Sequence, residues 1–140
     1  MTPVDPALTD ALPYTVLLPC QPESVGRARD LVSCAFGAWG MPEMADDAKI
    51  IVSELVTNVV DHTSTALTTV AIERDSPRCV RIQVADASRV PPRVADASSG
   101  AECGRGLRLV EGLSCRWGYD DKVWGKVTWA ELGMPSESDR

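Results

Sequence analysis

No part of the sequence approaches the roughly 20 consecutive apolar residues that a membrane-spanning helix needs. Its start, MTPVDPALTDALPYT, has neither the basic residues nor the apolar run of a cleavable signal segment. The cysteines are five in number, form no CxxC pair, and predict free thiols rather than a disulfide framework or a zinc site. These deficits predict a cytoplasmic protein with no membrane partner.

Basic residues are also scarce, with 14 Lys and Arg against 20 Asp and Glu and a net charge of -6. Binding to nucleic acid depends on clustered Lys and Arg that neutralise phosphates. We therefore expect no nucleic-acid partner. Only three of the basic residues are Lys, and this bias towards Arg indicates a GC-rich genome more than a binding patch.

The composition fits one soluble domain, because 44% of the 140 residues are apolar and 24% are charged. Three prolines and no periodic pattern in residues 1–13 predict a flexible lead. Residues 134–140 are expected to form a disordered tail, which leaves residues 14–133 as the folded domain.

Apolar periodicity divides the domain into helices and strands. Helical spacing runs from Pro22 to Trp39, again from about residue 42 or 43 to His62, and in a short stretch from Gly104 to about Ser114. Strand-like runs cover residues 14–19, 66–73, 79–85, 115–119 and 126–132, and the second and third of these predict an antiparallel hairpin. Residues 87–103 contain two consecutive prolines and little apolar content, which is typical of a lid or binding loop.

Four polar residues share about a quarter of the circumference of the second helix, namely Glu54, Asn58, Asp61 and His62. A carboxylate and a carboxamide one turn apart suit magnesium and a water molecule, since the amide oxygen can bind the cation and the carboxylate can accept a proton. Asn58 is the only Asn in the chain and His62 the only His. A solvated helix face has the same spacing, so the spacing alone leaves both interpretations open.

Two further features suit a nucleotide. Asp86 ends the strand-like run RIQVAD, where a carboxylate can accept a hydrogen bond from an exocyclic amine such as adenine N6. An Asp in this position also commonly starts a turn. Gly104 and Gly106 open a helix after the loop, where backbone N–H groups can approach a phosphate, although such a pair often serves only as a turn.

Taken together and in order, four segments resemble the motifs of the Bergerat or GHKL ATP-binding superfamily, which includes histidine-kinase catalytic domains, gyrase, Hsp90 and MutL. ELVTNVVDH (54–62) resembles the N-box, VADAS (84–88) and GRGL (104–107) the two glycine boxes, and KVTWAEL (126–132) the final strand. The resemblance covers nearly the whole chain. It implies an α+β fold, a two-layer sandwich whose mixed, mostly antiparallel sheet is covered on one face by about three helices.

The resemblance also implies roles for individual residues. Glu54 is expected to be the catalytic base and Asn58 the magnesium ligand, and Asp86 is expected to bind adenine N6. The other residues expected to contact the nucleotide lie in or beside the same motifs: Asp61, His62, Ser88, Gly104, Arg105, Gly106, Leu107 and Thr128.

Within the superfamily the chain is most similar to anti-sigma-factor serine/threonine kinases, because it is short and carries the stretch GRGLRLVEGLSCRWGY. This implies a kinase that uses ATP and Mg2+, binds a sigma factor, and phosphorylates a STAS-type anti-anti-sigma protein to regulate transcription. Two positions depart from the motifs, since Ser88 replaces the glycine of DxG and Thr63 follows His62 in place of glycine. The alternative is a non-catalytic, ATP-binding regulator that acts by binding a protein partner, and a homodimer also remains open.

Overall fold

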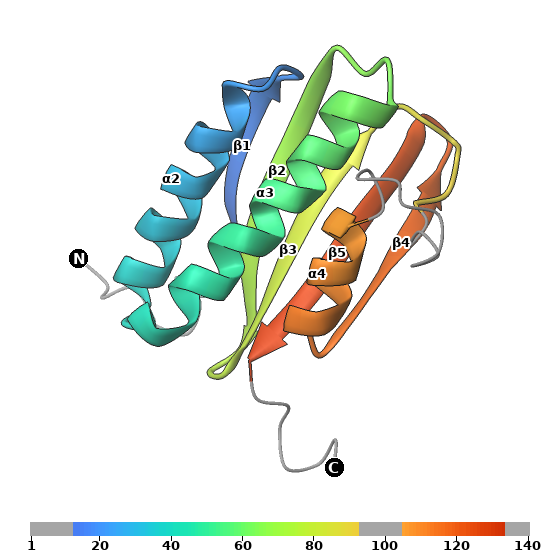
Figure 1. Cartoon of the computed structure of the whole chain (residues 1–140). Coiled ribbons are helices and arrows are strands. Elements are labelled where there is room, and N and C mark those ends of the chain that lie inside the picture. The colour runs from blue at the N-terminus through green and yellow to red at the C-terminus, as the bar shows by residue number, and fades with distance from the viewer. Residues whose placement is uncertain (1–12, 93–104, 134–140) are drawn as a thin grey trace, which may run out of the picture.

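The computed structural model describes residues 13–92 and 105–133, which form two layers (Figure 1). The strands are β1 (Tyr14–Pro19), β2 (Leu67–Ser76), β3 (Cys79–Asp86), β4 (Arg116–Lys122) and β5 (Gly125–Gly133), and the helices are α2 (Ser24–Ala38), the 3-10 helix η1 (Pro42–Met44), α3 (Ala45–His62) and α4 (Arg105–Leu113). The strands form one sheet in the order β1-β2-β3-β5-β4, and all four ladders are antiparallel. Helices α2, α3 and α4 cover one face of it, which confirms the α+β sandwich expected from the sequence. The described strands form a wholly antiparallel sheet, whereas a mixed sheet was expected.

The elements lie close to the spans that the sequence predicts, with one notable difference in β4. This strand continues to Lys122, which pairs with Gly125, so the turn to β5 consists of Val123 and Trp124 alone. The polar residues before that turn were expected to form a loop. They are accommodated because β4 is an edge strand, whose side chains can remain in water. None of the described helices is long and apolar enough to cross a membrane.

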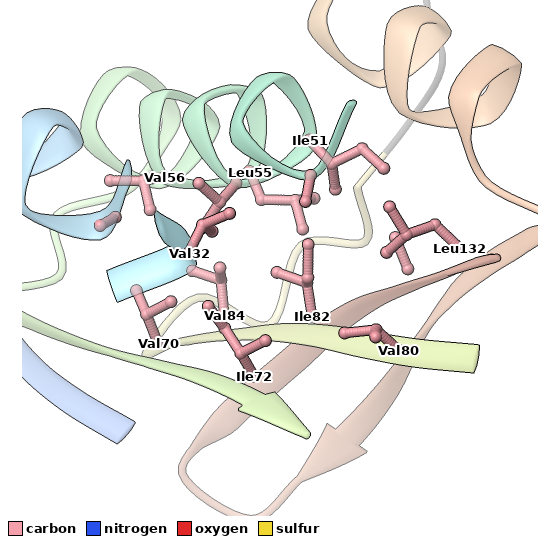
Figure 2. Close-up of a cluster of buried hydrophobic side chains, with 14 of the residues drawn as sticks. Val32, Ile51, Leu55, Val56, Val70, Ile72, Val80, Ile82, Val84 and Leu132 are labelled. Atoms are coloured by element: carbon pink, nitrogen blue, oxygen red, sulfur yellow. The ribbon is translucent and has the colours of Figure 1, made fainter. Parts of the chain in front are cut away.

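The core lies between the sheet and the helices (Figure 2). Alternate residues of the central strands point into it because successive side chains of a strand face opposite sides. The helix-facing set comprises Val70 and Ile72 of β2, Val80, Ile82 and Val84 of β3, and Leu132 of β5. Ile51, Leu55 and Val56 of α3 pack onto this set, and Val56 lies beside Val32 of α2.

The other face of the sheet is covered by its own side chains rather than by any described helix. Trp129 of β5 lies under Arg81 of β3, whose guanidinium carbon is 4.3 Å from the ring centroid. The ring lies over Gly118 of β4, where an added Cβ would be 2.9 Å from Trp129 Cζ2. Glu131 forms ion pairs with Arg81 and Arg116. We call Arg81, Arg116, Trp129 and Glu131 the open-face cluster.

Asp75 of β2 lies at the margin of the open-face cluster. Burial, together with the nearby carboxyl groups of Glu131 and Glu73, raises the pKa of Asp75 to about 6. Burial alone would raise the pKa of Glu131, but its hydrogen bond and ion pair with Arg116 lower it. Ligand atoms of Asp75, Cys79 and Glu131 lie within 4.8 Å of one another. A metal ion is disfavoured there for two reasons. The carboxylate of Glu131 already forms ion pairs with arginines, and burial raises the pKa of the Cys79 thiol to about 11, so that the thiolate needed as a ligand is rare.

The raised pKa of Asp75 predicts how stability depends on pH. The folded-state value of about 6 exceeds the ordinary value of 3.8, so protonation of Asp75 favours the folded state. This contribution is complete below pH 3.8 and is lost as the pH rises through 6. Asp75→Asn, which stays neutral, should therefore raise the free energy of unfolding relative to wild type at pH 7.5 more than at pH 4.5. Urea titrations at the two pH values measure the difference.

Asp30→Asn on α2 is the matched control, because the Asp30 side chain is exposed and lies away from the open-face cluster. It should follow the pH dependence of the wild type. An Asp75→Asn variant whose stability differs from wild type equally at both pH values would contradict the raised pKa of Asp75.

Gly125, the first residue of β5, is held against the end of β3. Its φ is +155°, and an added Cβ would lie 2.0 Å from the backbone oxygen of Asp86. Gly125→Ala should therefore lower the free energy of unfolding by about 1–3 kcal/mol, since backbone must move to admit the methyl group. Gly26→Ala on α2, where nothing lies within 4 Å, should instead stabilise the fold by about 0.5–1 kcal/mol. Chemical denaturation compares the two variants, and equal effects would argue against the close approach at Gly125.

Candidate functional site

The helix-facing side of the sheet becomes polar at the end where β3 finishes. Asp86 pairs in register with Lys126 of β5, and Thr128 lies one row further in, opposite Val84. Thr68 of β2 is close by, because its hydroxyl donates to the carbonyl oxygen of Ala85 at 2.7 Å. All four polar side chains are buried. Polar groups are costly to bury without partners. These four buried polar residues, which lie among valines and isoleucines, are therefore candidates for a binding site.

The carboxylate of Asp86 organises the turn that follows β3. Its Oδ1 accepts hydrogen bonds from Lys126 Nζ at 2.9 Å and from the backbone N–H of Ser88 at 2.8 Å. Lys126 Nζ also donates to the carbonyl oxygen of Ser88 at 3.3 Å. The hydroxyl of Ser88 accepts the backbone N–H of Val90 at 3.1 Å. The residue that replaces the motif glycine is thus built into a hydrogen-bonded turn.

Cys20 also belongs to this end of the sheet. It follows β1, and its backbone N–H donates to the carbonyl oxygen of Ala66 at 2.9 Å. Burial, and to a lesser extent the negative charge of Asp86, raise the pKa of the Cys20 thiol. The thiol is therefore neutral and contributes no reactive thiolate to the site.

Helix α3 carries Glu54 and Asn58 on the flank that faces away from α2. The helix runs between α2 and α4 (Figure 1), and Val56 marks its α2 side. Glu54 and Asn58 each lie about 200° around the helix from Val56. Both side chains are half-buried, whereas Asp61 and His62 are exposed at the end of the helix. The structure thus brings Glu54 and Asn58 to the α4 side of α3 and leaves the other two residues of the predicted stripe in solvent.

The end of α3 is joined to the turn after β3 through two threonines. The hydroxyl of Thr63 lies 2.8 Å from the carbonyl oxygen of Val59 and 2.9 Å from the hydroxyl of Thr65. Thr65 Oγ1 accepts the backbone N–H of Ala87 at 2.9 Å. The helix that carries Asn58 and the strand that carries Asp86 therefore finish at the same end of the fold. The sequence pattern gave no signal for Thr65, which lies between elements.

The second glycine box is only partly described by the structure. Gly104 and residues 93–103 of the predicted lid lie outside the described residues, as does the side chain of Arg105, and the exposure of Gly106 is not described either. Leu107 of α4 is 2% exposed and packs into the core with Val110. Leu107 therefore anchors α4 to the hydrophobic core.

The residues present suit ATP and magnesium, because they offer a hydrogen-bond acceptor for the base and an oxygen ligand for the cation. Oδ1 of Asp86 accepts both hydrogen bonds that the carboxylate receives from described residues, and no described donor binds Oδ2. Oδ2 can therefore accept a hydrogen bond from an exocyclic amine. Among the described residues, no three His, Cys, Asp or Glu ligands converge at α3, since the one such group lies by the open-face cluster. Magnesium suits a sparse site, because it keeps several waters and uses substrate phosphates beside one or two protein ligands. The amide oxygen of Asn58 fits that description, and the carboxylate of Glu54, one turn away on the same helix, can accept a proton.

Comparison with known proteins identifies the family. Residues 18–131 match the family model of the histidine kinase-like ATPase domain. Among solved structures, the chain is similar to the histidine kinase domain of the blue-light activated histidine kinase from Erythrobacter litoralis EL346, with 20% identity and a TM-score of 0.45. That match covers 82% of this chain and 61% of the other, so this chain spans about three fifths of its length. No curated protein matches the sequence significantly.

The family match includes the α3 residues Glu54 and Asn58, the end of β3 with Asp86, and Thr128 of β5. It extends over most of the chain and over every element of the sheet from β2 to β4. This extent assigns the domain, and the family supports binding of ATP. The chain belongs to the histidine kinase-like ATPase domain family.

Proposed function

We propose that this chain is a serine/threonine protein kinase of the anti-sigma-factor type, using ATP with Mg2+. In this proposal it binds a sigma factor and phosphorylates a STAS-type anti-anti-sigma protein in the cytoplasm, so that transcription is regulated by partner switching. The observation that carries it is the placement of Glu54 and Asn58. They are half-buried, one turn apart, and lie on a helix whose end is hydrogen-bonded to the turn after Asp86.

Each polar residue then has a distinct task. Asp86 Oδ2 accepts a hydrogen bond from the adenine amine, and Thr128 borders the base from the next strand. Asn58 supplies an amide oxygen to magnesium, which when bound neutralises charge on the phosphates. Glu54 accepts the proton of the serine hydroxyl as the serine oxygen bonds to the γ-phosphorus of ATP and the bond from that phosphorus to the leaving ADP breaks. Asp61 and His62 are exposed and are available to the phosphates or to the protein substrate.

Ser88 favours a second candidate, a non-catalytic regulator that binds a protein partner. A glycine at this position would let a ligand approach the backbone closely. The hydroxyl of Ser88 instead accepts the N–H of Val90, which fixes the turn through the chain's own groups. A preformed turn of this kind suits a binding surface as well as it suits a nucleotide pocket.

Substitution of Glu54 tests the catalytic role. Glu54→Gln should reduce phosphorylation of a STAS-type protein by about 100- to 10,000-fold, because the amide cannot accept the proton. The affinity for ATP should change little, since Glu54 acts on the hydroxyl rather than on the nucleotide. Transfer of labelled phosphate from ATP to serine, and calorimetric titration with ATP, measure the two quantities.

Glu43→Gln, the same change at an exposed position of η1, is the matched control and should transfer phosphate at the wild-type rate. Phosphorylation that survives Glu54→Gln would remove Glu54 from the mechanism. Binding of ATP by the wild type without any phosphorylation would favour the non-catalytic regulator. No binding of ATP or ADP at millimolar concentration would reject the kinase and leave a partner-binding module.

Substitution of Asn58 tests the magnesium ligand. Asn58→Ala should weaken binding of ATP by about tenfold or more when magnesium is present, because the cation loses its protein ligand. With EDTA in place of magnesium, the variant and the wild type should bind ATP about equally. Calorimetry under the two conditions separates these outcomes. An equal loss of affinity in both would show that Asn58 contacts the nucleotide rather than the cation.

A further inference from the structure

Lys126 and Asp86 form an ion pair inside the candidate site. Their side chains are 3% and 2% exposed, and Nζ lies 2.9 Å from Oδ1. Removing water from two charges is costly, and removing one partner of such a pair leaves the other buried and uncompensated. Because the pair joins β3 to β5 at the polar end of the sheet, it lies where the proposed adenine contact is made.

The hydrogen bonds of the pair give the two carboxylate oxygens different tasks. The Nζ group of Lys126 and the N–H of Ser88 both donate to Oδ1. The same Nζ group also donates to the carbonyl oxygen of Ser88, so Lys126 is itself held in place. No described donor reaches Oδ2. Lys126 therefore fixes the rotation of the carboxylate and leaves one oxygen for a ligand.

An ionised carboxylate can only accept hydrogen bonds, whereas a protonated carboxyl can also donate one. The amine at position 6 of adenine donates, but the oxygen at position 6 of guanine or hypoxanthine accepts. Two acceptors that face each other in a buried site repel, and both remain unpaired. The ammonium group of Lys126 holds Oδ1, so that Oδ2 is the oxygen left to meet position 6 of the base.

We propose that Lys126 is a specificity-determining residue that selects 6-amino over 6-oxo purine nucleotides by fixing the Asp86 carboxylate through Oδ1, with Oδ2 left to accept. The proposal rests on the proposed binding of ATP at Asp86 and concerns its base selectivity. Lys126 acts through Asp86, and is therefore a positioning residue. A purely structural role for Lys126 would affect all purine nucleotides alike, which gives the two roles different consequences.

The test compares the affinities of ATP and ITP for the full-length chain, with magnesium present. Wild type should prefer ATP by at least about tenfold, because ITP presents an acceptor to Oδ2. In Lys126→Met the preference should fall to about threefold or less, since the carboxylate loses the hydrogen bond that fixes its rotation and no longer presents a fixed acceptor to the base. Lys126→Arg, which retains a cation, should keep most of the preference. Lys122→Met, at an exposed lysine of β4, is the control and should behave as wild type.

A second variant covers the case in which Lys126→Met fails to fold. The double variant Asp86→Asn with Lys126→Met removes both charges together, so that no buried charge is left unpaired. Its amide offers a donor and an acceptor, and it should bind ATP and ITP with similar affinities. Circular dichroism confirms the fold of each variant before titration.

The outcomes separate this inference from the proposed kinase. If either folded variant without Lys126 keeps the wild-type preference for ATP, or if wild type shows none, the role of Lys126 is overturned while ATP binding stands. ATP binding without phosphate transfer rejects the kinase but leaves the selectivity of Lys126 intact. If the wild type binds no ATP, both proposals fail.

Discussion

Antiparallel pairing joins β3 to β5 along their whole lengths, although residues 87–124 separate the two strands in the chain. The register of this ladder places Asp86 opposite Lys126, so that two charges are buried as a pair. Because side chains alternate along a strand, a shift by one residue would exchange the two faces of the sheet. The core valines, the site and the open-face cluster therefore all depend on this one register.

The two faces of the sheet are covered in different ways. Helices cover one face. Glu54 and Asn58 lie on that side of the molecule, on the flank of α3 that faces α4. The other face relies on Trp129, which lies flat over Gly118 and under Arg81. Long arginine side chains can cover apolar surface while their charged ends remain in contact with carboxylates or water. The residues proposed to bind a nucleotide thus lie on the opposite face of the sheet from the open-face cluster.

The sequence predicted the helices and the fold class well, because apolar periodicity determines which side of α2 and α3 is buried. It also indicated Glu54 and Asn58, whose spacing along one helix is local information. Lys126 and Thr65 were missed, since their partners, Asp86 and Ala87, lie far away in the chain and meet them only after the sheet has formed. The length of β4 was underestimated for a similar reason: polar residues such as Asp120 and Asp121 give no strand signal on an edge.

The hydrogen bond between Thr65 and Ala87 has a consequence for regulation. It links the end of α3 to the residue after Asp86, so displacement at one is felt at the other. If a protein docks on α3 and shifts its end, this link would carry the displacement to the turn after Asp86 and change the affinity of the proposed site for nucleotide. By thermodynamic reciprocity, nucleotide then changes the affinity for that protein by the same factor. In the proposed kinase, a single threonine hydroxyl would thus be a physical route between the nucleotide site and a protein partner.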